Sequence, residues 1–274
     1  MSISFANLRY RGLSARTSAQ LAVALLLGSG CRVQGEGGGG QVSNELVAQT
    51  PAEELLTRAI AFHDPAGRWA SHIFQLEWYG TGSDGSERVS VDLTLHPDGQ
   101  QFKLSGRYQG STLEYEADAE KWTASVDGVS DPAQEVREKM RLHREDGWFW
   151  RSYYGFLVGM PMKLRDPGTQ IDPDPIPTTF EGHDVLALRV TYDQEVGTDT
   201  WYFYLDPDTA RLVGCRFYHD EEANDGEYIV LEGLIESDGV KLPRHRRWYV
   251  NADGRFLGAD EIRGLELVAV SVGS

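Results

Sequence analysis

The residue types best suited to hold a metal ion occur together between positions 219 and 227. Residues 219–222 read His-Asp-Glu-Glu, and Asp225 and Glu227 follow. Carboxylate oxygens and one imidazole form a ligand set that divalent cations accept. Residues 224–226 read Asn-Asp-Gly, which is typical of a turn. We interpret the segment as a solvated acidic hairpin loop, and we predict neither a metal site nor a cofactor.

Two further groups of residues could carry chemistry. His63 and Asp64 are adjacent and could act as an acid–base pair, but they directly precede Pro65. A proline at that point is typical of a helix end followed by a turn, and we interpret the pair in that way.

A basic cluster lies within residues 241–247. Alternation along a strand would put Arg244 and Arg246 on one face with Trp248, and His245, Arg247 and Tyr249 on the other. A cluster divided in this way is expected to pair with acidic neighbours. A clamp for an anionic headgroup is the functional alternative.

The motifs of common enzyme classes are absent from the sequence. It contains no His-Glu-x-x-His, no phosphate-binding loop, no Cys-x-x-Cys and no Gly-x-Ser-x-Gly elbow. We therefore predict a domain without catalytic residues.

The segment 148–160 is the feature with most functional promise, because nine of its residues are large and apolar. A helix that is apolar on most sides is expected to be buried. It either fills the interior of the protein as core or acts as a movable lid over an apolar pocket. In the second case we predict that the pocket is lined by Trp150, Tyr154, Phe156, Trp201 and Phe203. Arg151 and Lys163 flank the helix and would face an anionic end of the ligand.

The elements that must position these residues are mainly strands. Thr50, Pro51 and Glu53 predict a capped helix start, with the helix ending near residues 63–65. Strands with one buried face follow over residues 72–118, joined by short turns that indicate an antiparallel meander. A helix is expected from Asp131 to about His143, and residues 166–177, with four prolines, are expected to be loop.

Strands return over residues 186–270, and those near 201–205 are apolar on both faces. One face would meet helices and the other would line an interior. The predicted fold is mainly β (α+β): an open, highly curved antiparallel sheet wrapped around a few helices.

The N-terminus predicts export and lipid attachment. Residues 1–30 combine three arginines with a short apolar run, as in a secretory signal peptide. Small residues precede Cys31, as in the lipobox of bacterial lipoproteins, although Gly28 stands where leucine is usual. Ordinary cleavage with release of a secreted protein is the alternative, and a bridge from Cys31 to Cys215 would then become possible. We expect a signal peptide at 1–30, a lipidated Cys31 with a flexible tether over 31–49, and one domain over 50–274.

Charge limits the partners of this domain. The net charge of −16 becomes −19 when the three arginines of the signal are removed. An acidic body does not favour nucleic acid or anionic lipid surfaces. We expect the protein to be a monomer. We also expect it to lie in the cell envelope (periplasm or outer membrane), attached to a membrane only through the lipid on Cys31.

Four sequence segments resemble an uncharacterised family of bacterial secreted proteins and lipoproteins. They are Phe62–Pro65, Gly159–Thr169, Asp199–Tyr204 and Phe217–Asp220, and the resemblance covers roughly residues 50–260. More distantly, the order of elements is similar to that of the lipoprotein-sorting proteins LolA and LolB. That resemblance implies an unclosed, curved β-barrel with helices over a hollow that takes acyl chains.

Three functions from different classes are compatible with these features. The first is binding or carriage of a lipid or lipopeptide acyl chain. The second is a structural or protein-interaction module of the envelope. The third is a hydrolase, which would require converging ionisable groups with perturbed pKa values.

Overall fold

The computed structural model describes residues 49–96, 101–118, 120–142 and 149–270. The predicted signal peptide, Cys31 and all but the last residue of the tether lie outside these residues, as does Trp148.

The first helix, α1 (Pro51–His63), begins with the predicted capping box. Thr50 Oγ1 accepts a hydrogen bond from the Glu53 amide at 3.2 Å, and Glu53 Oε2 accepts one from the Thr50 amide at 3.0 Å. These bonds satisfy amides that have no partner within the helix. The helix buries Ala52, Leu55, Leu56 and Ala59 and lies beside β12 (Val240–Val250).

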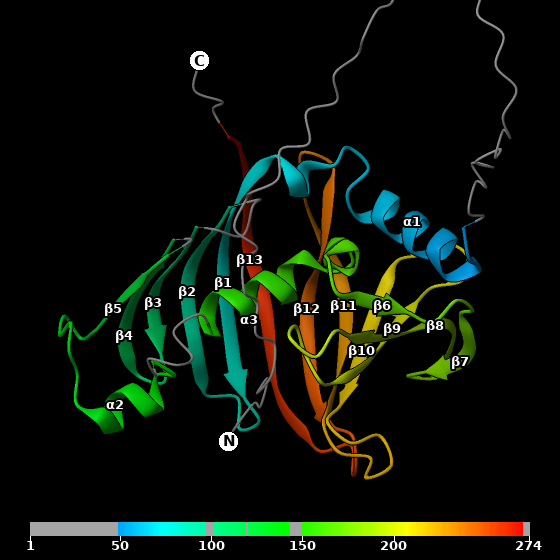
Figure 1. Ribbon diagram of the computed structural model, residues 1–274. Coiled ribbons are helices and arrows are strands. Elements are labelled where there is room, and N and C mark those ends of the chain that lie inside the picture. The colour runs from blue at the N-terminus through cyan, green and yellow to red at the C-terminus, as the bar shows by residue number, and fades with distance from the viewer. Residues whose placement is uncertain (1–48, 97–100, 119, 143–148, 271–274) are drawn as a thin grey trace, which may run out of the picture. The chain divides into compact units, whose positions relative to one another are not determined.

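Within the described residues, thirteen strands form one antiparallel sheet (Figure 1). The strands besides β12 are β1 (His72–Gly82), β2 (Glu87–Leu95), β3 (Phe102–Tyr108), β4 (Ser111–Ala117), β5 (Trp122–Val126), β6 (Thr169–Ile171), β7 (Ile176–Phe180), β8 (His183–Tyr192), β9 (Thr200–Leu205), β10 (Leu212–Tyr218), β11 (Glu227–Ser237) and β13 (Phe256–Ala269). Their order is β5-β4-β3-β2-β1-β13-β12-β11-β10-β9-β8-β6, and β7 also pairs with β8.

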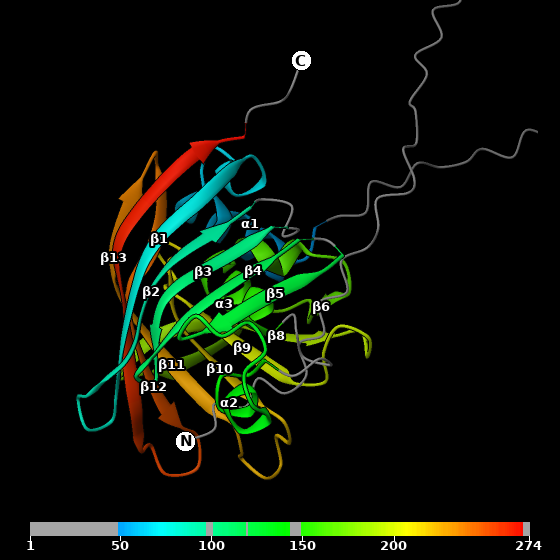
Figure 2. The same cartoon turned by 90° about the vertical axis from the view of Figure 1, so that its left-hand side faces the viewer.

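The sheet curves strongly and does not close on itself, because its two end strands, β5 and β6, do not pair with each other (Figure 2). The alternation of residue types sets its two faces. In β4, Leu113, Tyr115 and Ala117 are buried, whereas Glu114 and Glu116 are exposed. The predicted fold, an open and curved antiparallel sheet around a few helices, is confirmed.

Helix α3 (Phe149–Gly159) lies on the concave face of the sheet in both views (Figures 1 and 2). It is short and apolar, and eight of its eleven residues are buried. Short 3-10 turns, η1 (Arg68–Ala70) and η2 (Met162–Arg165), follow α1 and α3. None of the described helices is long and apolar enough to cross a membrane.

Two local predictions are wrong. Helix α2 covers only Gln134–Lys139, because no side chain caps its start and Arg141 adopts a left-handed φ of 54° after its end. The expected loop 166–177 contains β6 and the start of β7. Pro177 is compatible with β7 because, within the part of the chain that the structure describes, that strand pairs on one side only, with β8.

The expected interior on the second face of β9 is also wrong. Trp201 and Phe203 belong to the main core with α3, but Tyr204 belongs to a second, smaller core. There the ring of Phe180 stacks on Tyr204 with centroids 4.2 Å apart. Gly214 permits this, because a Cβ at position 214 would lie 2.2 Å from the Phe180 ring. Within the described residues, the second face of β9 therefore packs against Phe180 at the end of β7, in a small core shared with β8 and β11.

Candidate ligand-binding site

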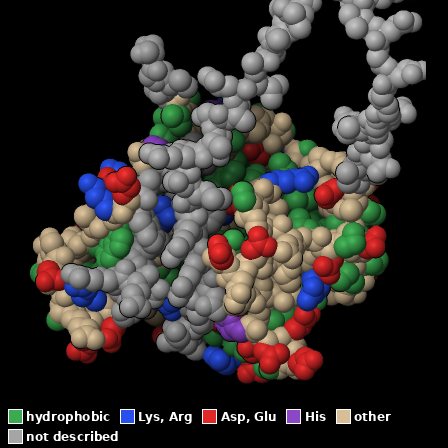
Figure 3. Space-filling model, viewed as in Figure 1, with side chains coloured by type: hydrophobic (Ala, Val, Ile, Leu, Met, Phe, Trp, Pro, Cys, Tyr) green, Lys and Arg blue, Asp and Glu red, His purple; other side chains and the backbone are tan. Residues whose placement is uncertain are grey.

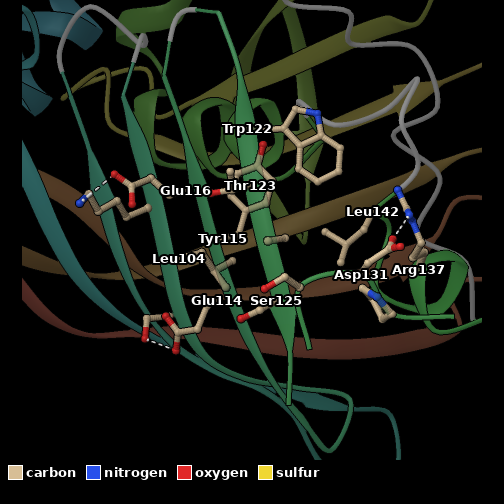
Figure 4. A pocket seen from close by; sticks show the side chains of 15 residues that line it. Leu104, Glu114, Tyr115, Glu116, Trp122, Thr123, Ser125, Asp131, Arg137 and Leu142 are labelled. Atoms are coloured by element: carbon tan, nitrogen blue, oxygen red, sulfur yellow. Dashed lines mark hydrogen bonds and ion pairs between the residues drawn. The ribbon is translucent and has the colours of Figure 1, made fainter. Parts of the chain in front are cut away.

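A pocket of about 870 Å³ lies beside β3, β4 and β5, with the segment around α2 on its other side (Figure 4). The residues that line it come from β3 (Lys103, Leu104, Ser105), β4 (Glu114, Tyr115, Glu116), β5 (Trp122, Thr123, Ala124, Ser125) and the α2 region (Ser130, Asp131, Pro132, Arg137, Leu142). A volume of this size lies within the range of about 300–1,000 Å³ that is usual for small-molecule sites.

The pocket has an apolar inner wall. Leu104, Tyr115 and Leu142 are buried, and the ring of Trp122 stacks on Tyr115 with centroids 5.9 Å apart. Burial raises the pKa of Tyr115 well above its usual value, and the nearby Arg151 guanidinium lowers it by a smaller amount. The phenol is therefore neutral. The apolar surface that a ligand could cover here belongs mainly to the half-buried Trp122 and Ala124.

The rim of the pocket is polar and its charges are paired. Lys103 lies 3.0 Å from Glu116, and Arg137 lies 2.8 Å from Asp131. The Ser105 hydroxyl donates to Glu114 at 2.8 Å. The combination of an apolar wall and a polar rim suits an amphipathic ligand.

Aromatic contacts continue from the pocket wall to α3. The ring of Tyr115 lies 5.8 Å from Phe102, and Phe102 lies 6.2 Å from Tyr154. Tyr154 in turn stacks on Trp150 at 5.9 Å. The inner wall of the pocket is therefore one end of the aromatic core that holds α3.

The five aromatic residues predicted to line a pocket are all buried under the sheet. Trp150 and Tyr154 face the β1–β4 side, where Tyr154 contacts Trp78 at 5.1 Å. Phe156 contacts Trp201 at 4.8 Å, and Trp201 stacks on Phe203 at 5.7 Å. None of the five is among the described residues that line the 870 Å³ pocket. Their role toward a ligand stays a prediction.

The structure does not bring the two predicted cationic residues together. Arg151 lies in the first turn of α3, is 7% exposed, and donates to the Asp118 carbonyl at 3.5 Å. Lys163 lies beyond the other end of α3 and pairs with Asp166. Their role toward an anionic end of the ligand stays a prediction.

Sequence reasoning missed β5, the strand that contributes most to the pocket. Its residues alternate apolar Trp122, Ala124 and Val126 with polar Thr123 and Ser125. This period of two is the signal that could have identified the strand.

A buried ionic network lies beneath α3. The Asp260 carboxylate accepts hydrogen bonds from Arg88 at 2.5 Å and from the Trp248 indole at 2.8 Å. Gly80 leaves room for it, because a Cβ there would lie 2.2 Å from Asp260 Oδ1. Arg246 lies opposite Asp260 in the strand pairing, and burial lowers the pKa of its guanidinium to about 10, opposed by Asp260.

The network also holds α3 in place. Arg246 donates to the Leu157 carbonyl at 3.2 Å, near the C-terminus of the helix, where cations are favourable. The exposed members of the basic cluster pair with acids, as predicted: Arg244 with Glu261 at 3.2 Å and Arg247 with Glu232 at 2.9 Å.

The acidic segment around residue 220 is a hairpin loop between β10 and β11, at an end of the molecule where acidic side chains gather (Figure 3). Asp225 accepts bonds from the amides of His219 and Asp220, at 2.8 and 2.9 Å. The His219 ring bonds to buried Asp199 at 2.8 Å. Burial raises the pKa of Glu227 to about 7. In the described part of the chain, no three such side chains converge as a metal site.

His63 has a structural role. Its Nδ1 donates to the Lys241 carbonyl at 2.6 Å, and its Nε2 accepts from the Leu212 amide at 3.0 Å. Only the neutral ring can do both. Asp64 accepts bonds from the amides of Arg68 and Trp69 and so orders the turn after α1, as interpreted from the sequence.

We expect the protein to lose stability in acid through His63. Burial lowers its pKa from 6.5 to about 4. Between pH 6.5 and 4, His63 is protonated in the unfolded chain but neutral in the folded chain. The free energy of unfolding therefore falls as pH decreases from 6.5 toward 4. The loss at pH 4 is about 3 kcal/mol. Urea unfolding of the wild type and of His63→Gln should show a steeper pH dependence in the wild type between pH 4 and 6.5. Identical slopes would contradict this assignment.

A family model described as "Family of unknown function (DUF6503)" matches residues 48–263. The chain belongs to the DUF6503 family. The resemblance to an uncharacterised family that the sequence motifs indicated is thereby confirmed. Among curated proteins, none matches the chain.

Solved structures similar to this DUF6503 chain include three bacterial proteins. A LolA superfamily protein from Nitrosomonas europaea is 12% identical, with a TM-score of 0.49 over 81% of this chain and 96% of that one. A putative outer membrane lipoprotein-sorting protein domain from Vibrio parahaemolyticus is 14% identical, with a TM-score of 0.47 over 79% and 93%. A DUF1329 family protein from Desulfovibrio piger is 11% identical, with a TM-score of 0.46 over 82% and 95%. Likeness at this level says nothing about ligand or activity.

Proposed function

We propose that this DUF6503 domain is a non-catalytic binding or carrier domain for a hydrophobic ligand, such as a lipid or the acyl chain of a lipopeptide. The observation that carries the proposal is the 870 Å³ pocket, whose inner wall of Leu104, Tyr115, Trp122 and Leu142 leads into the aromatic core around α3. An acyl chain would cover this wall, and a polar headgroup would remain at the charged rim.

The wall would bind mainly through Trp122, because burying its exposed apolar surface contributes about 25 cal/mol per Å². Trp122 is its most accessible large side chain, since it is half-buried while Leu104, Tyr115 and Leu142 are buried. Trp150 and Tyr154 lie behind the wall and would line a deeper extension if α3 shifted. The three other predicted residues, Phe156, Trp201 and Phe203, would be reached only by a larger displacement of α3.

We further propose that the chain acts in the cell envelope as a lipoprotein anchored through Cys31. The support is the N-terminal sequence: a basic start, a short apolar run and small residues before Cys31, followed by a glycine-rich tether. Mass spectrometry of the mature N-terminus would show a diacylglyceryl or triacyl mass on Cys31. An unmodified N-terminus at another position would contradict the anchor.

Replacing Trp122 with alanine is expected to weaken binding of a dansyl-labelled undecanoic acid about tenfold. The substitution removes an aromatic contact, and a loss of about 1.4 kcal/mol corresponds to that factor. Dansyl fluorescence on titration with purified protein gives the affinity. Tyr249→Ala is the matched control, because Tyr249 is a half-buried aromatic that stacks on Tyr228, remote from the pocket lining. Equal affinities in the wild type and Trp122→Ala, or no binding at all, would contradict the proposal.

A further inference from the structure

The pocket lies along an open edge of the sheet. Among the described strands, β5 is the last in the strand order and pairs only with β4. Its sequence, Trp-Thr-Ala-Ser-Val, carries no charge and no proline. Charged residues and prolines usually protect an edge strand, because its exposed backbone groups otherwise pair with other strands. An unprotected edge beside a pocket therefore needs an explanation.

The strand register identifies which backbone groups of β5 are available. Two backbone hydrogen bonds show which residues of β5 bond to β4 and which face away from it. The Asp118 amide donates to the Lys121 carbonyl (2.9 Å), and the Asp127 amide donates to the Thr112 carbonyl (2.9 Å). Between these points Thr123 and Ser125 direct their N–H and C=O groups toward β4. Trp122, Ala124 and Val126 direct theirs outward.

One of these three outward positions is already used. Val126 exchanges two hydrogen bonds with Val129, at 3.0 and 2.9 Å, and this bridge closes the end of the edge. The other two have no backbone partner on that side within the described residues. Trp122 and Ala124 thus present two donors and two acceptors in the spacing of a strand.

The pocket follows this edge and not one face of the sheet. Four consecutive residues, Trp122 to Ser125, line it, although their side chains alternate between the two faces. The opposite wall consists of residues 130–132 and Arg137 (Figure 4). The space beside the backbone is therefore part of the pocket.

The side chains around the edge define the chemistry of a strand that would fit. Residues of a partner placed opposite Trp122 and Ala124 would point to the concave face, toward Tyr115 and Leu142, where apolar side chains are favoured. The residue between them would point to the outer face. There Glu114 and Glu116 are exposed: Glu116 pairs with Lys103 at 3.0 Å, whereas Glu114 accepts a hydrogen bond from the neutral Ser105 hydroxyl, so the negative charges outnumber the positive one.

We propose that the β5 edge docks an extended peptide segment with alternating apolar and basic residues, which adds a strand to the sheet through the backbone of Trp122 and Ala124. This mode of recognition combines main-chain hydrogen bonds with alternate side-chain pockets. The proposal goes beyond the proposed function, because the peptide strand would bind through backbone groups at the edge of the pocket and does not require the pocket to bind a hydrophobic chain.

The test uses a fluorescein-labelled heptapeptide of alternating leucine and lysine, titrated with purified protein by fluorescence anisotropy. Ala124→Pro removes one outward N–H, and a proline at such an edge position leaves the pairing with β4 intact. We expect binding to weaken at least about tenfold in Ala124→Pro, and to be unchanged in the control Ala124→Ser, which keeps the N–H. Wild-type affinity in Ala124→Pro would overturn the proposal.

A second measurement leaves the protein unaltered. Two isomers of the peptide carry N-methyl groups on alternate amides, so that only one isomer loses the N–H groups that face β5. One isomer should lose binding and the other should keep it, whereas equal affinities would overturn the proposal. A leucine–glutamate heptapeptide should bind about tenfold more weakly because it faces Glu114 and Glu116.

Binding of dansyl-labelled undecanoic acid by the same variants distinguishes the peptide-docking edge from the proposed hydrophobic-ligand site. Ala124→Pro should retain it, because the substitution leaves the inner wall in place. Selectivity between the peptide isomers without fatty-acid binding would support the docking edge and contradict the proposed function.

Discussion

Replacing Asp260 with alanine is expected to lower the free energy of unfolding by about 3–5 kcal/mol. Asp260 is 2% exposed and accepts hydrogen bonds from Arg88 and Trp248. Its removal leaves Arg246, which is 1% exposed, without the carboxylate that lies opposite it. A buried guanidinium without a counter-charge is costly, and this cost exceeds the worth of the lost bonds.

Urea unfolding followed by circular dichroism measures this change. Asp92→Ala is the matched control, because Asp92 is an exposed aspartate in the neighbouring strand β2. We expect it to change the free energy of unfolding by less than about 0.5 kcal/mol. Asp260→Asn keeps the size and one hydrogen bond but removes the charge, and should fall between the two. An Asp260→Ala variant as stable as Asp92→Ala would show that the network contributes nothing.

Phe156→Ala is expected to destabilise the protein by a similar amount, about 3–5 kcal/mol. Phe156 is 4% exposed, and its ring packs against Trp201 and Phe203 on the concave face of the sheet. Truncation removes buried apolar surface and leaves a cavity that a curved sheet cannot collapse to fill. The result also decides between the two interpretations of α3, because a lid that opens readily would lose little stability.

Leu234→Ala serves as the control, since Leu234 is a large apolar residue that is 37% exposed. Its loss should cost less than about 1 kcal/mol. Hydrogen exchange provides an independent measurement: amides of α3 should exchange only with global unfolding if the helix is core. Rapid exchange of α3 together with a small effect of Phe156→Ala would instead favour a movable lid.

The sequence was most informative where the physical signal is local. The capping box at Thr50 and the alternation in β4 each depend on residues a few positions apart, and both were predicted. The length of α2 was not predicted, because its ends lack side-chain caps and only the left-handed Arg141 ends it. β6 and the start of β7 were also missed: β6 has only three residues, and Pro177 in β7 normally argues against a strand and is permitted by its edge position.

The candidate site could be predicted only in part. The apolar segment 148–160 was predicted to be a buried helix, and α3 is buried. Its Tyr154 is connected to the pocket wall only through Phe102, so the predicted role of these aromatic residues toward a ligand stays a prediction. The pocket itself arises from β5 and the α2 region, which are brought beside each other by the chain path and share no sequence pattern. The ion pair of Arg88 and Asp260, 172 residues apart, was equally inaccessible to local reasoning.

The position of β1 in the sheet has a consequence for how this chain folds during synthesis. β1 pairs with β2 on one side and with β13 on the other, over eleven residue pairs from His72 to Gly82. The meander β1–β5 can form from local contacts as it emerges, but β1 retains an open edge until the last strand of the domain arrives. Closing so long a loop is slow, and an exposed strand edge invites aggregation in the meantime. A chain built in this way benefits from protection of the open β1 edge until the synthesis of β13 is finished.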